Sequence, residues 1–120
     1  MAYSLKKLGM NFTVIERGAD VGGTWQWNRY PGCRFDSESE TYGYSFSKEL
    51  LQEWDWKERF SAREDTEEYL QYVVKKFDLR KYMQFNLMFT AATWQEDGNY
   101  WRVTLSDGRN VTARFVLTAV

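Results

Sequence analysis

The sequence of 120 residues predicts an α/β fold, because three different hydrophobic patterns follow one another along it. A short helix and a buried strand come first, an amphipathic helix lies in the middle, and alternating apolar residues near the end predict a three-stranded antiparallel β-meander. The loop Val21–Tyr44 separates the first two patterns and holds the only Pro, the only Cys and four of the eight Gly. Connecting loops are usually shorter and less aromatic, so this segment is predicted to bind a flat ligand.

The first helix and strand have the order of a dinucleotide-binding unit. Met1–Leu8 carries apolar residues at helical spacing, and Gly9 is a helix stop. Asn11–Glu16 reads as a short buried strand that ends in a carboxylate. In the second half of a Rossmann-like βαβ unit, such a carboxylate accepts hydrogen bonds from the adenosine ribose. Glu16 is the candidate for that role.

The first half of such a unit is not in the sequence. Its Gly-x-Gly-x-x-Gly turn lies about 20 residues before the acidic residue, and no Gly occurs before Gly9. We therefore expect residues 1–120 to be a fragment of one dinucleotide-binding domain whose first strand and glycine turn are absent. The alternative is that the helix and strand serve another purpose.

The middle of the chain predicts two helical segments. Ser47–Lys57 is expected to form a short helix or helical turn packed by its aromatic residues. Ser61 and Glu64 have capping-box spacing, so the next helix is expected over Glu64–Phe77, covering a sheet, with its charges on a solvated face. The apolar residues of this helix share one face and are Tyr69, Leu70, Val73, Val74 and Phe77.

From Gln84 the apolar period changes to two, with Phe85, Leu87 and Phe89 expected on one face of the first meander strand. Turns are expected at Asp97–Asn99 and at Asp107-Gly108, with strands over Tyr100–Leu105 and Asn110–Val120. The final run, Phe115–Val120, is apolar without alternation and is therefore predicted to enter a buried parallel sheet.

Composition excludes several function classes. The 16 Lys and Arg against 17 Asp and Glu give a net charge of −1, which argues against a nucleic-acid partner or an anionic membrane. No apolar run reaches the roughly 20 residues of a membrane-spanning helix. The absence of His and the single Cys exclude Ser-His-Asp and Cys-His nucleophiles and the usual zinc sites. One Cys also fits a reducing compartment, and a cytoplasmic protein is expected.

The run Gly22–Ser39, with Tyr42, Tyr44–Phe46, Gln52–Trp54 and Trp56, resembles the type I Baeyer-Villiger monooxygenases of the cyclohexanone and phenylacetone monooxygenase kind. The similarity continues through Glu68–Leu70, Lys76–Arg80 and Thr90–Ala92 to Arg114–Leu117, so it covers essentially the whole chain. The resemblance implies a flavoprotein that uses FAD, NADPH and O2 to insert one oxygen atom next to a ketone carbonyl, giving an ester or lactone. It further implies a fragment of the FAD-binding domain, without the NADPH domain and inactive without the rest of the polypeptide.

The same resemblance assigns the site residues. For FAD it implies contacts from Glu16, Gly22, Gly23, Thr24, Trp25, Asp36, Tyr42 and Phe89, the last through its backbone. It places Arg34, Phe35 and Asp36 where NADPH approaches the flavin. Asp36 is the candidate catalytic residue, because in the family this carboxylate can hold and tune an active-site Arg that lies beyond Val120. No metal ion is expected.

Each assignment has an ordinary alternative. Glu16 can be a plain strand-end carboxylate, Gly22 and Gly23 turn glycines, and Cys33 a small buried thiol. The aromatic residues of the loop, Trp25, Trp27, Tyr30 and Tyr42, can belong to the core. Two other functions remain open: a related flavin monooxygenase that hydroxylates nitrogen or sulfur, and a non-catalytic binding or interaction module that is stable without flavin.

Overall fold

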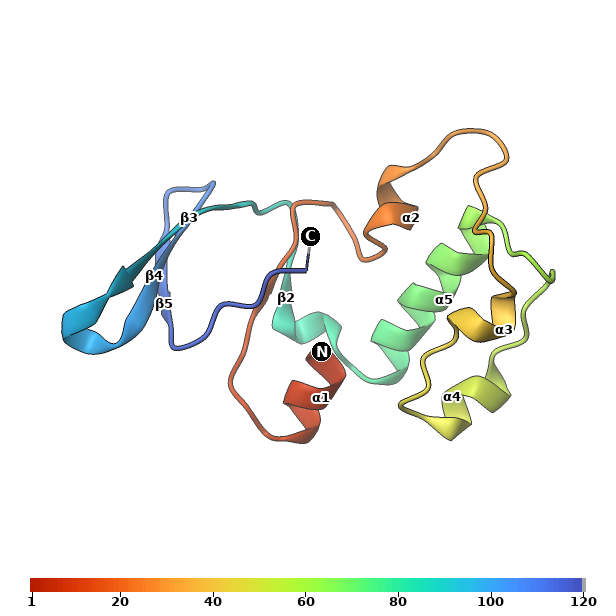
Figure 1. Cartoon of the computed structure of the whole chain (residues 1–120), viewed down its shortest axis with the longest axis horizontal. Helices are drawn as coiled ribbons and strands as arrows, with labels where there is room; N and C mark the ends of the chain where they lie inside the picture. Colours follow the sequence, from red (N-terminus) through yellow and green to blue (C-terminus); the bar gives the residue numbers. More distant parts are fainter. Residues whose placement is uncertain (120) are drawn as a thin grey trace.

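The computed structural model describes residues 1–119 and has the predicted α/β composition (Figure 1). The helices are α1 (Ala2–Lys7), α2 (Thr24–Trp27), α3 (Ser39–Tyr42), α4 (Lys48–Glu53), α5 (Arg63–Lys76) and the 3₁₀ turns η1 (Arg80–Tyr82) and η2 (Glu96–Gly98). The strands are β1 (Val14–Ile15), β2 (Met83–Gln84), β3 (Phe89–Gln95), β4 (Tyr100–Leu105) and β5 (Asn110–Ala113).

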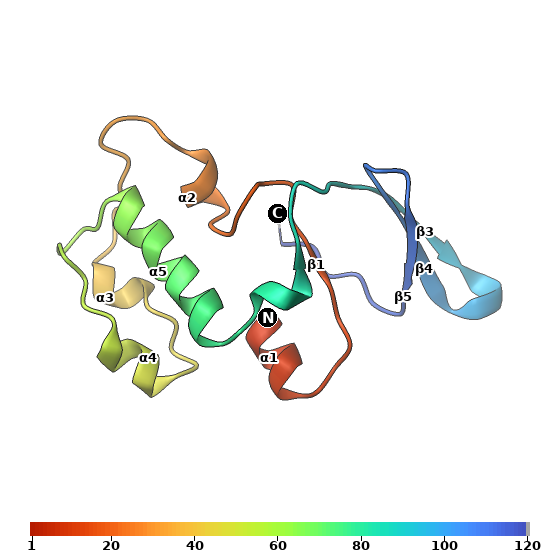
Figure 2. The same cartoon turned by 180° about the vertical axis from the view of Figure 1, so that it is seen from behind.

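The molecule is elongated, with extents of 53 × 33 × 22 Å. The meander β3–β5 forms one end, α3, α4 and α5 form the other, and α1 with the β1–β2 pair lies between them (Figures 1 and 2). The short helix α2 lies between this central pair and α5 in both views. The loop predicted to bind a ligand therefore connects the strands to the helical end.

The central sheet is a parallel pair. Val14 of β1 is in register with Met83 of β2, and Ile15 with Gln84. The pairing continues past the strands, because Glu16 donates its N–H to Gln84 O at 2.9 Å and Leu87 donates to Glu16 O at 3.0 Å. Parallel strands require a long crossover, which the helices α2 to α5 supply. The expected strand Asn11–Glu16 is thus present but regular over only two residues.

The antiparallel meander β3–β4–β5 is confirmed. Val103 and Leu105 of β4 are buried together with Leu87, and Ile15 of β1 packs against them. Asn99, with a left-handed φ of +51°, and Gly108, with φ of +86°, make the turns at the expected places. This cluster joins the meander to the central sheet.

Two strand predictions are wrong. Gln84 belongs to β2, and residues 85–88 form no strand because Asn86 adopts φ of +54° and interrupts the extended backbone, so the first meander strand begins at Phe89. Residues 115–119 form no strand either, and Phe115 and Leu117 are 75% and 64% exposed. A strand needs a hydrogen-bonding edge, and no described strand pairs with this run. Val120, the end of the predicted strand, lies outside the described residues.

Helix α5 has the expected apolar face but a different setting. Tyr69 and Val73 are buried with Leu50 of α4, while Leu70 packs against a second cluster that contains Trp25 of α2. The helix therefore covers other helices and the loop, and its predicted position over a sheet is wrong. An apolar helix face predicts that the face is buried, but it does not show whether the neighbouring element is a strand or a helix.

The helix starts differ in their caps. Ser47 caps α4 as a side-chain acceptor for Leu50 N–H at 3.2 Å, so this helix starts as expected and ends at Glu53. The capping box predicted for α5 is wrong, because Ala62 is its N-cap and makes no side-chain bond. Ser61 instead turns into the interior, where its Oγ lies 2.8 Å from Ser39 Oγ.

Candidate functional site

Glu16 lies at the carboxyl end of β1 and fixes the turn that follows. Its Oε1 accepts a hydrogen bond of 2.5 Å from Gly18 N–H, and Gly18 O accepts one of 2.9 Å from Asn86. A Cβ at Gly18 would lie only 3.0 Å from Glu16 Oε1, so a larger residue there would push the Glu16 carboxylate aside. The other carboxylate oxygen accepts no hydrogen bond from residues 1–119. Glu16 therefore holds the turn with one oxygen and offers the other to a ligand.

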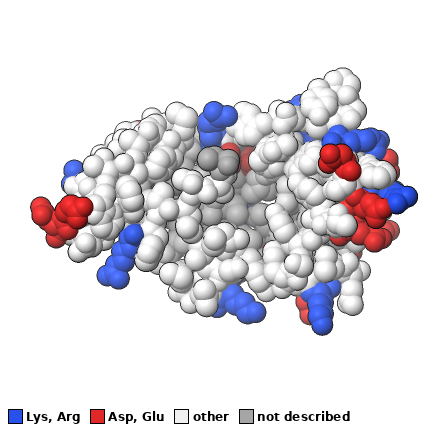
Figure 3. Space-filling view, in the orientation of Figure 1, with Lys and Arg blue, Asp and Glu red and all other residues white. Residues whose placement is uncertain are grey.

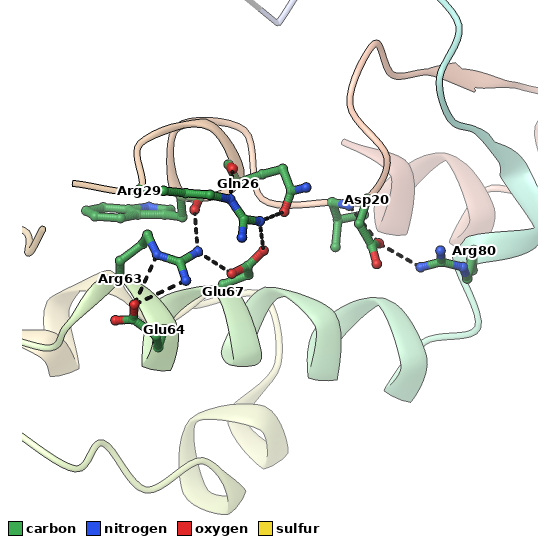
Figure 4. Close-up of polar contacts among 9 residues, drawn as sticks. Asp20, Gln26, Arg29, Arg63, Glu64, Glu67 and Arg80 are labelled. Carbon is green, nitrogen blue, oxygen red and sulfur yellow. Dashed lines mark hydrogen bonds and ion pairs between the residues drawn. The ribbon is translucent and has the colours of Figure 1, made fainter. Parts of the chain in front are cut away.

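The next part of the loop is held by an ion pair. Asp20 Oδ1 accepts from Arg80 Nη1 of η1 at 2.7 Å and from Val21 N–H at 2.8 Å (Figure 4). Burial opposes ionisation of Asp20, but the hydrogen bonds from Arg80 and Val21 outweigh it and hold the pKa of the carboxyl below its ordinary value of 3.8. The Arg80 guanidinium also lies 4.7 Å from the centre of the Phe85 ring. This pair ties the loop to the segment that leads into β2.

The glycine pair opens α2 in a conformation that other residues rarely adopt. Gly22 and Gly23 have φ of +137° and +49°. A Cβ at Gly22 would lie 3.1 Å from Gln26 N, whereas a Cβ at Gly23 would meet nothing within 4 Å. Gly22 therefore packs on its own helix, while Gly23 presents open backbone. Thr24 follows as the exposed first residue of α2.

Three predicted aromatic residues form one cluster. The rings of Phe35 and Tyr42 stack at 4.6 Å with an interplanar angle of 11°, and Trp25 meets Phe35 edge-on at 5.6 Å. Trp25 Nε1 donates to the Tyr42 hydroxyl at 2.6 Å. An indole N–H is only a donor, so the Tyr42 oxygen is the acceptor and its own proton remains available. Trp25 and Phe35 are 8% exposed and Tyr42 is 36% exposed, so only Tyr42 offers a substantial surface.

The remaining loop residues divide between core and surface. Cys33 is buried against Trp25 and Phe35, as the ordinary interpretation expects. Trp27 and Tyr30 are 53% and 60% exposed, so they do not belong to the core. The Arg17 guanidinium lies 4.6 Å from the Trp27 ring centre, which gives that indole a cationic neighbour.

Arg34 and Asp36 differ in whether their side chains are paired. Arg34 Nη1 donates to Glu58 Oε2 at 2.5 Å and to Phe60 O at 2.8 Å, and the bond to Glu58 raises the pKa of the guanidinium. Asp36 is exposed, and its carboxylate has no hydrogen bond or ion pair with any described residue. Arg34 is therefore already engaged, whereas Asp36 is free to bind a ligand or another part of the polypeptide.

Phe89 begins β3 and is 41% exposed. Its backbone pairs with Leu105, and the register shifts between Phe89 and Ala91. The hydrogen bond from Leu87 to Glu16 brings the segment before β3 to the end of β1. Phe89 therefore lies two positions after Leu87, which donates a hydrogen bond to Glu16. Trp25, Phe35 and Tyr42 form a separate group around α2.

A set of charged residues that was not predicted from the sequence holds α2 against α5. The side chains of Arg63 and Glu67 are only 11% and 14% exposed, so the expectation that all charges of this helix face solvent is wrong. Their i,i+4 spacing was the available signal, but it is common on solvated helix faces and does not reveal a partner. Figure 4 shows both side chains directed toward the α2 segment.

Many of the remaining charged residues lie at the helical end. In Figure 3, Lys, Arg, Asp and Glu crowd the end formed by α3, α4 and α5, while uncharged atoms cover most of the middle. Ion pairs at this end include Arg34–Glu58, Arg59–Glu38 and Lys57–Glu68. Within residues 1–119 no three acidic, His or Cys side chains gather as a metal site. None of the helices described has the length and apolarity to cross a membrane.

The residues around β1 and α2 fit the adenosine and pyrophosphate parts of a flavin dinucleotide. Glu16 has a free acceptor for ribose hydroxyls, Gly23 leaves room where a Cβ would stand, and Tyr42 has a free proton to donate. Fewer of the residues predicted for NADPH are free to bind it, because Arg34 is paired with Glu58 and Phe35 is buried. Only Asp36 of that predicted set presents a free polar group.

The chain is similar to known proteins over nearly its whole length. Residues 1–54 match the family model of the NAD(P)-binding Rossmann-like domain. The chain is 43% identical over 98% of its length to 2-oxo-Δ3-4,5,5-trimethylcyclopentenylacetyl-CoA monooxygenase of Pseudomonas putida, and 40% identical over 95% to a phenazine N-monooxygenase of Lysobacter antibioticus. The crystal structure of OTEMO in complex with FAD and NADP superimposes with a TM-score of 0.90 at 44% identity over 95% of the chain.

Baeyer-Villiger, cyclohexanone and cyclopentanone monooxygenases are among the other relatives. The chain is a homologue of one segment of the Baeyer-Villiger monooxygenases. It spans 22% and 21% of the two relatives above and 21% of the OTEMO chain. The resemblance carried by Gly22–Ser39 is thereby confirmed. Helix α2 lies within this run.

Proposed function

We propose that the chain contributes to the FAD-binding domain of a Baeyer-Villiger monooxygenase, an FAD- and NADPH-dependent enzyme that inserts one oxygen atom of O2 next to a ketone carbonyl to give an ester or lactone. The observation that carries the proposal is the arrangement of Glu16, Gly23 and Tyr42, each with a free polar group or open backbone on a fixed segment. The sequence identity of 43% to a monooxygenase over 98% of the chain supports the proposal.

The chain's own residues bind and orient the cofactor in this proposal. Glu16 accepts a ribose hydroxyl through the oxygen that does not bind Gly18, and the open side of Gly23 admits the pyrophosphate. Thr24, next to it, offers an exposed hydroxyl. Tyr42 donates its free proton, and the buried Trp25 acts by orienting that hydroxyl. The backbone of Phe89 completes the adenine side.

Bound FAD supplies the redox chemistry, taking electrons from NADPH and passing them to O2. Asp36 would hold an Arg supplied by the rest of the monooxygenase polypeptide and keep its charge directed at the reaction centre. Its exposure and its lack of a partner among residues 1–119 support this positioning role. Arg34 and Phe35 would act on the NADPH side by fixing the backbone next to Asp36, through the Glu58 ion pair and burial respectively.

A second candidate is N-oxygenation. The relative from Lysobacter antibioticus, at 40% identity, is a phenazine N-monooxygenase. The same cofactor half-site serves both reactions, so the substrate decides between them. A cytoplasmic location also belongs to the proposal, supported by the single, buried Cys33, and cell fractionation tests it.

The test is an activity assay on the full-length protein with NADPH, ¹⁸O2 and a panel of ketones and nitrogen heteroaromatics such as phenazine. We expect ketone-dependent NADPH oxidation and one labelled oxygen in an ester or lactone. Asp36→Asn should lower turnover at least about tenfold with FAD still bound, whereas Asp55→Asn, an exposed acid outside the site, should not. An FAD-loaded protein that oxygenates only nitrogen supports the second candidate, and one that oxygenates neither class contradicts the proposal.

A further inference from the structure

Glu67 of α5 lies between two arginines (Figure 4). Its Oε1 accepts a hydrogen bond from Arg29 Nη2 at 3.3 Å, and its Oε2 accepts one from Arg63 Nη1. Arg63 is on the same helix, whereas Arg29 follows the end of α2. One carboxylate therefore joins two segments that lie far apart in the sequence.

Each arginine also binds the backbone of α2. Arg63 Nη1 donates to Trp25 O at 3.0 Å, and Arg29 Nε donates to Gln26 O at 2.9 Å. Helix α2 has only four residues, too few to be stable alone. Its last carbonyls have no partner within the helix, and cationic donors are favoured at that end. The two guanidinium groups thus supply what α2 lacks.

Glu67, Arg63 and Arg29 together form a clamp on α2, and this clamp is partly buried. The side chains of Arg63 and Glu67 are 11% and 14% exposed, and the hydrogen bond from Arg63 to Glu67 raises the pKa of the guanidinium despite its burial. Removing one member of such a pair leaves an uncompensated charge in a poorly hydrated place. Arg29 is 56% exposed and is therefore the weaker arm.

The clamp acts on the residues that face the proposed ligand. Arg63 holds the carbonyl of Trp25, and the indole of the same residue donates to the Tyr42 hydroxyl at 2.6 Å. Gly23, with its open backbone, is the N-cap of the same four-residue helix. A shift of α2 would therefore move the Gly23 backbone and the Tyr42 hydroxyl together.

We propose that Glu67 is a positioning residue: through Arg63 and Arg29 it fixes α2 in the geometry that binds FAD, without touching the cofactor. The inference rests on the proposed function for its ligand, but the clamp itself is independent of it. Glu67→Gln keeps the size of the side chain and removes its charge. Glu68→Gln is the matched control, because Glu68 is the next residue on α5, is 62% exposed and pairs only with Lys57 among the described residues.

The first measurement is amide hydrogen exchange of the full-length protein without added FAD. Glu67→Gln should exchange about tenfold faster over residues 24–30, since a loss of about 1.4 kcal/mol in local stability has that effect. The meander and the Glu68→Gln protein should match the wild type. Unchanged exchange over residues 24–30 overturns the inference. Should Glu67→Gln unfold throughout, Arg29→Gln removes only the exposed arm, and it must still accelerate the same segment.

The second measurement is FAD affinity of the same proteins. We expect FAD to bind Glu67→Gln about tenfold more weakly, and Glu67→Asp, which keeps the charge, to recover most of the loss. If Glu67 only stabilised the fold, Glu67→Asp and Glu67→Gln proteins of equal thermal stability should bind FAD equally weakly. Equal FAD affinity in wild type and Glu67→Gln overturns the positioning role. A wild type that binds no FAD contradicts the proposed function and the flavin role of Glu67, while hydrogen exchange still decides whether the clamp exists.

Discussion

The indole N–H of Trp25 donates a hydrogen bond of 2.6 Å to the hydroxyl of Tyr42. This contact joins a side chain that is 8% exposed to one that is 36% exposed, so the core of the loop determines how a surface hydroxyl is directed. The stacking of Tyr42 on Phe35 at 4.6 Å fixes the ring plane as well. The core interpretation of the aromatic loop is therefore confirmed for Trp25, while the ligand-binding role of Tyr42 stays a prediction.

Replacing Tyr42 with Phe keeps this stacking but removes the acceptor. We expect a loss of about 1–2 kcal/mol in unfolding free energy, because the buried Trp25 N–H is left without a partner. FAD affinity should fall by about tenfold in addition. Denaturant unfolding and flavin titration measure the two effects. Tyr44→Phe is the control, since the Tyr44 hydroxyl makes no hydrogen bond within residues 1–119, and equal effects of both substitutions would argue against the role of Tyr42.

Gly23→Ala should separate stability from binding. The new Cβ meets nothing within 4 Å, so the cost is that of the backbone, whose φ of +49° and ψ of −118° are sparsely populated by residues other than glycine, about 1–3 kcal/mol. Gly9→Ala is a matched control, with φ of +67° and equally open space, but away from the proposed site. Both should lower the melting temperature, and only Gly23→Ala should weaken FAD binding. Identical FAD affinities of the two variants would remove Gly23 from the site.

The pair of Asp20 and Arg80 makes stability depend on pH in the acidic range. The pKa of the Asp20 carboxyl is lower in the folded state than its ordinary value of 3.8. The unfolded chain therefore binds the proton more readily, and the stabilisation is present above pH 3.8 and lost as pH falls through the lowered pKa. Asp20→Asn should be less stable than wild type at pH 7 and approach it at pH 3.

Urea unfolding at several pH values checks this expectation, and Arg80→Gln should reduce the same pH-dependent difference, leaving the part that comes from the Val21 N–H. Asp97→Asn, in the exposed turn η2, is the control and should leave the pH dependence unaltered. A stability difference between wild type and Asp20→Asn that stays constant from pH 7 to pH 3 would refute the assignment to this carboxyl.

A buried pair of serines holds the loop against the segment before α5. Ser39 Oγ accepts from Ser61 N–H at 3.0 Å, and the two side chains are 2% and 0% exposed. Ser39→Ala leaves this buried N–H without an acceptor and should cost about 1–3 kcal/mol in unfolding free energy. Ser37→Ala, two residues earlier and exposed, should change stability by less than about 0.5 kcal/mol. Thermal unfolding followed by circular dichroism compares them, and equal stabilities would contradict the account.

The sequence predicted what local pattern and composition determine. The α/β class, the meander with its turns at Asn99 and Gly108, and the apolar face of α5 follow from periodicity and left-handed turn residues. The family followed from the resemblance carried by the run Gly22–Ser39, which is rich in glycine and aromatic residues. These features need no knowledge of distant contacts.

The errors concern long-range partners. The Ser61 side chain had a competing acceptor and donor in Ser39, so the capping box did not form. Glu67 looked like a solvated helix residue because its second partner, Arg29, lies 38 positions away. Residues 115–119 have strand-like composition, but a strand forms only beside an edge. No pattern in the sequence specifies such partners.

The most direct test of the account is a titration of the full-length protein with FAD, FMN and riboflavin, followed by flavin fluorescence and absorbance. The account predicts saturable binding that is much tighter for FAD than for the other two, because the proposed contacts of Glu16 and Gly23 are with the adenosine and pyrophosphate half. Glu16→Gln, which can still accept from Gly18, should weaken FAD about tenfold and leave FMN unchanged. Equal affinity for all three flavins, or no saturable binding by a cooperatively folded protein, would contradict the central claim.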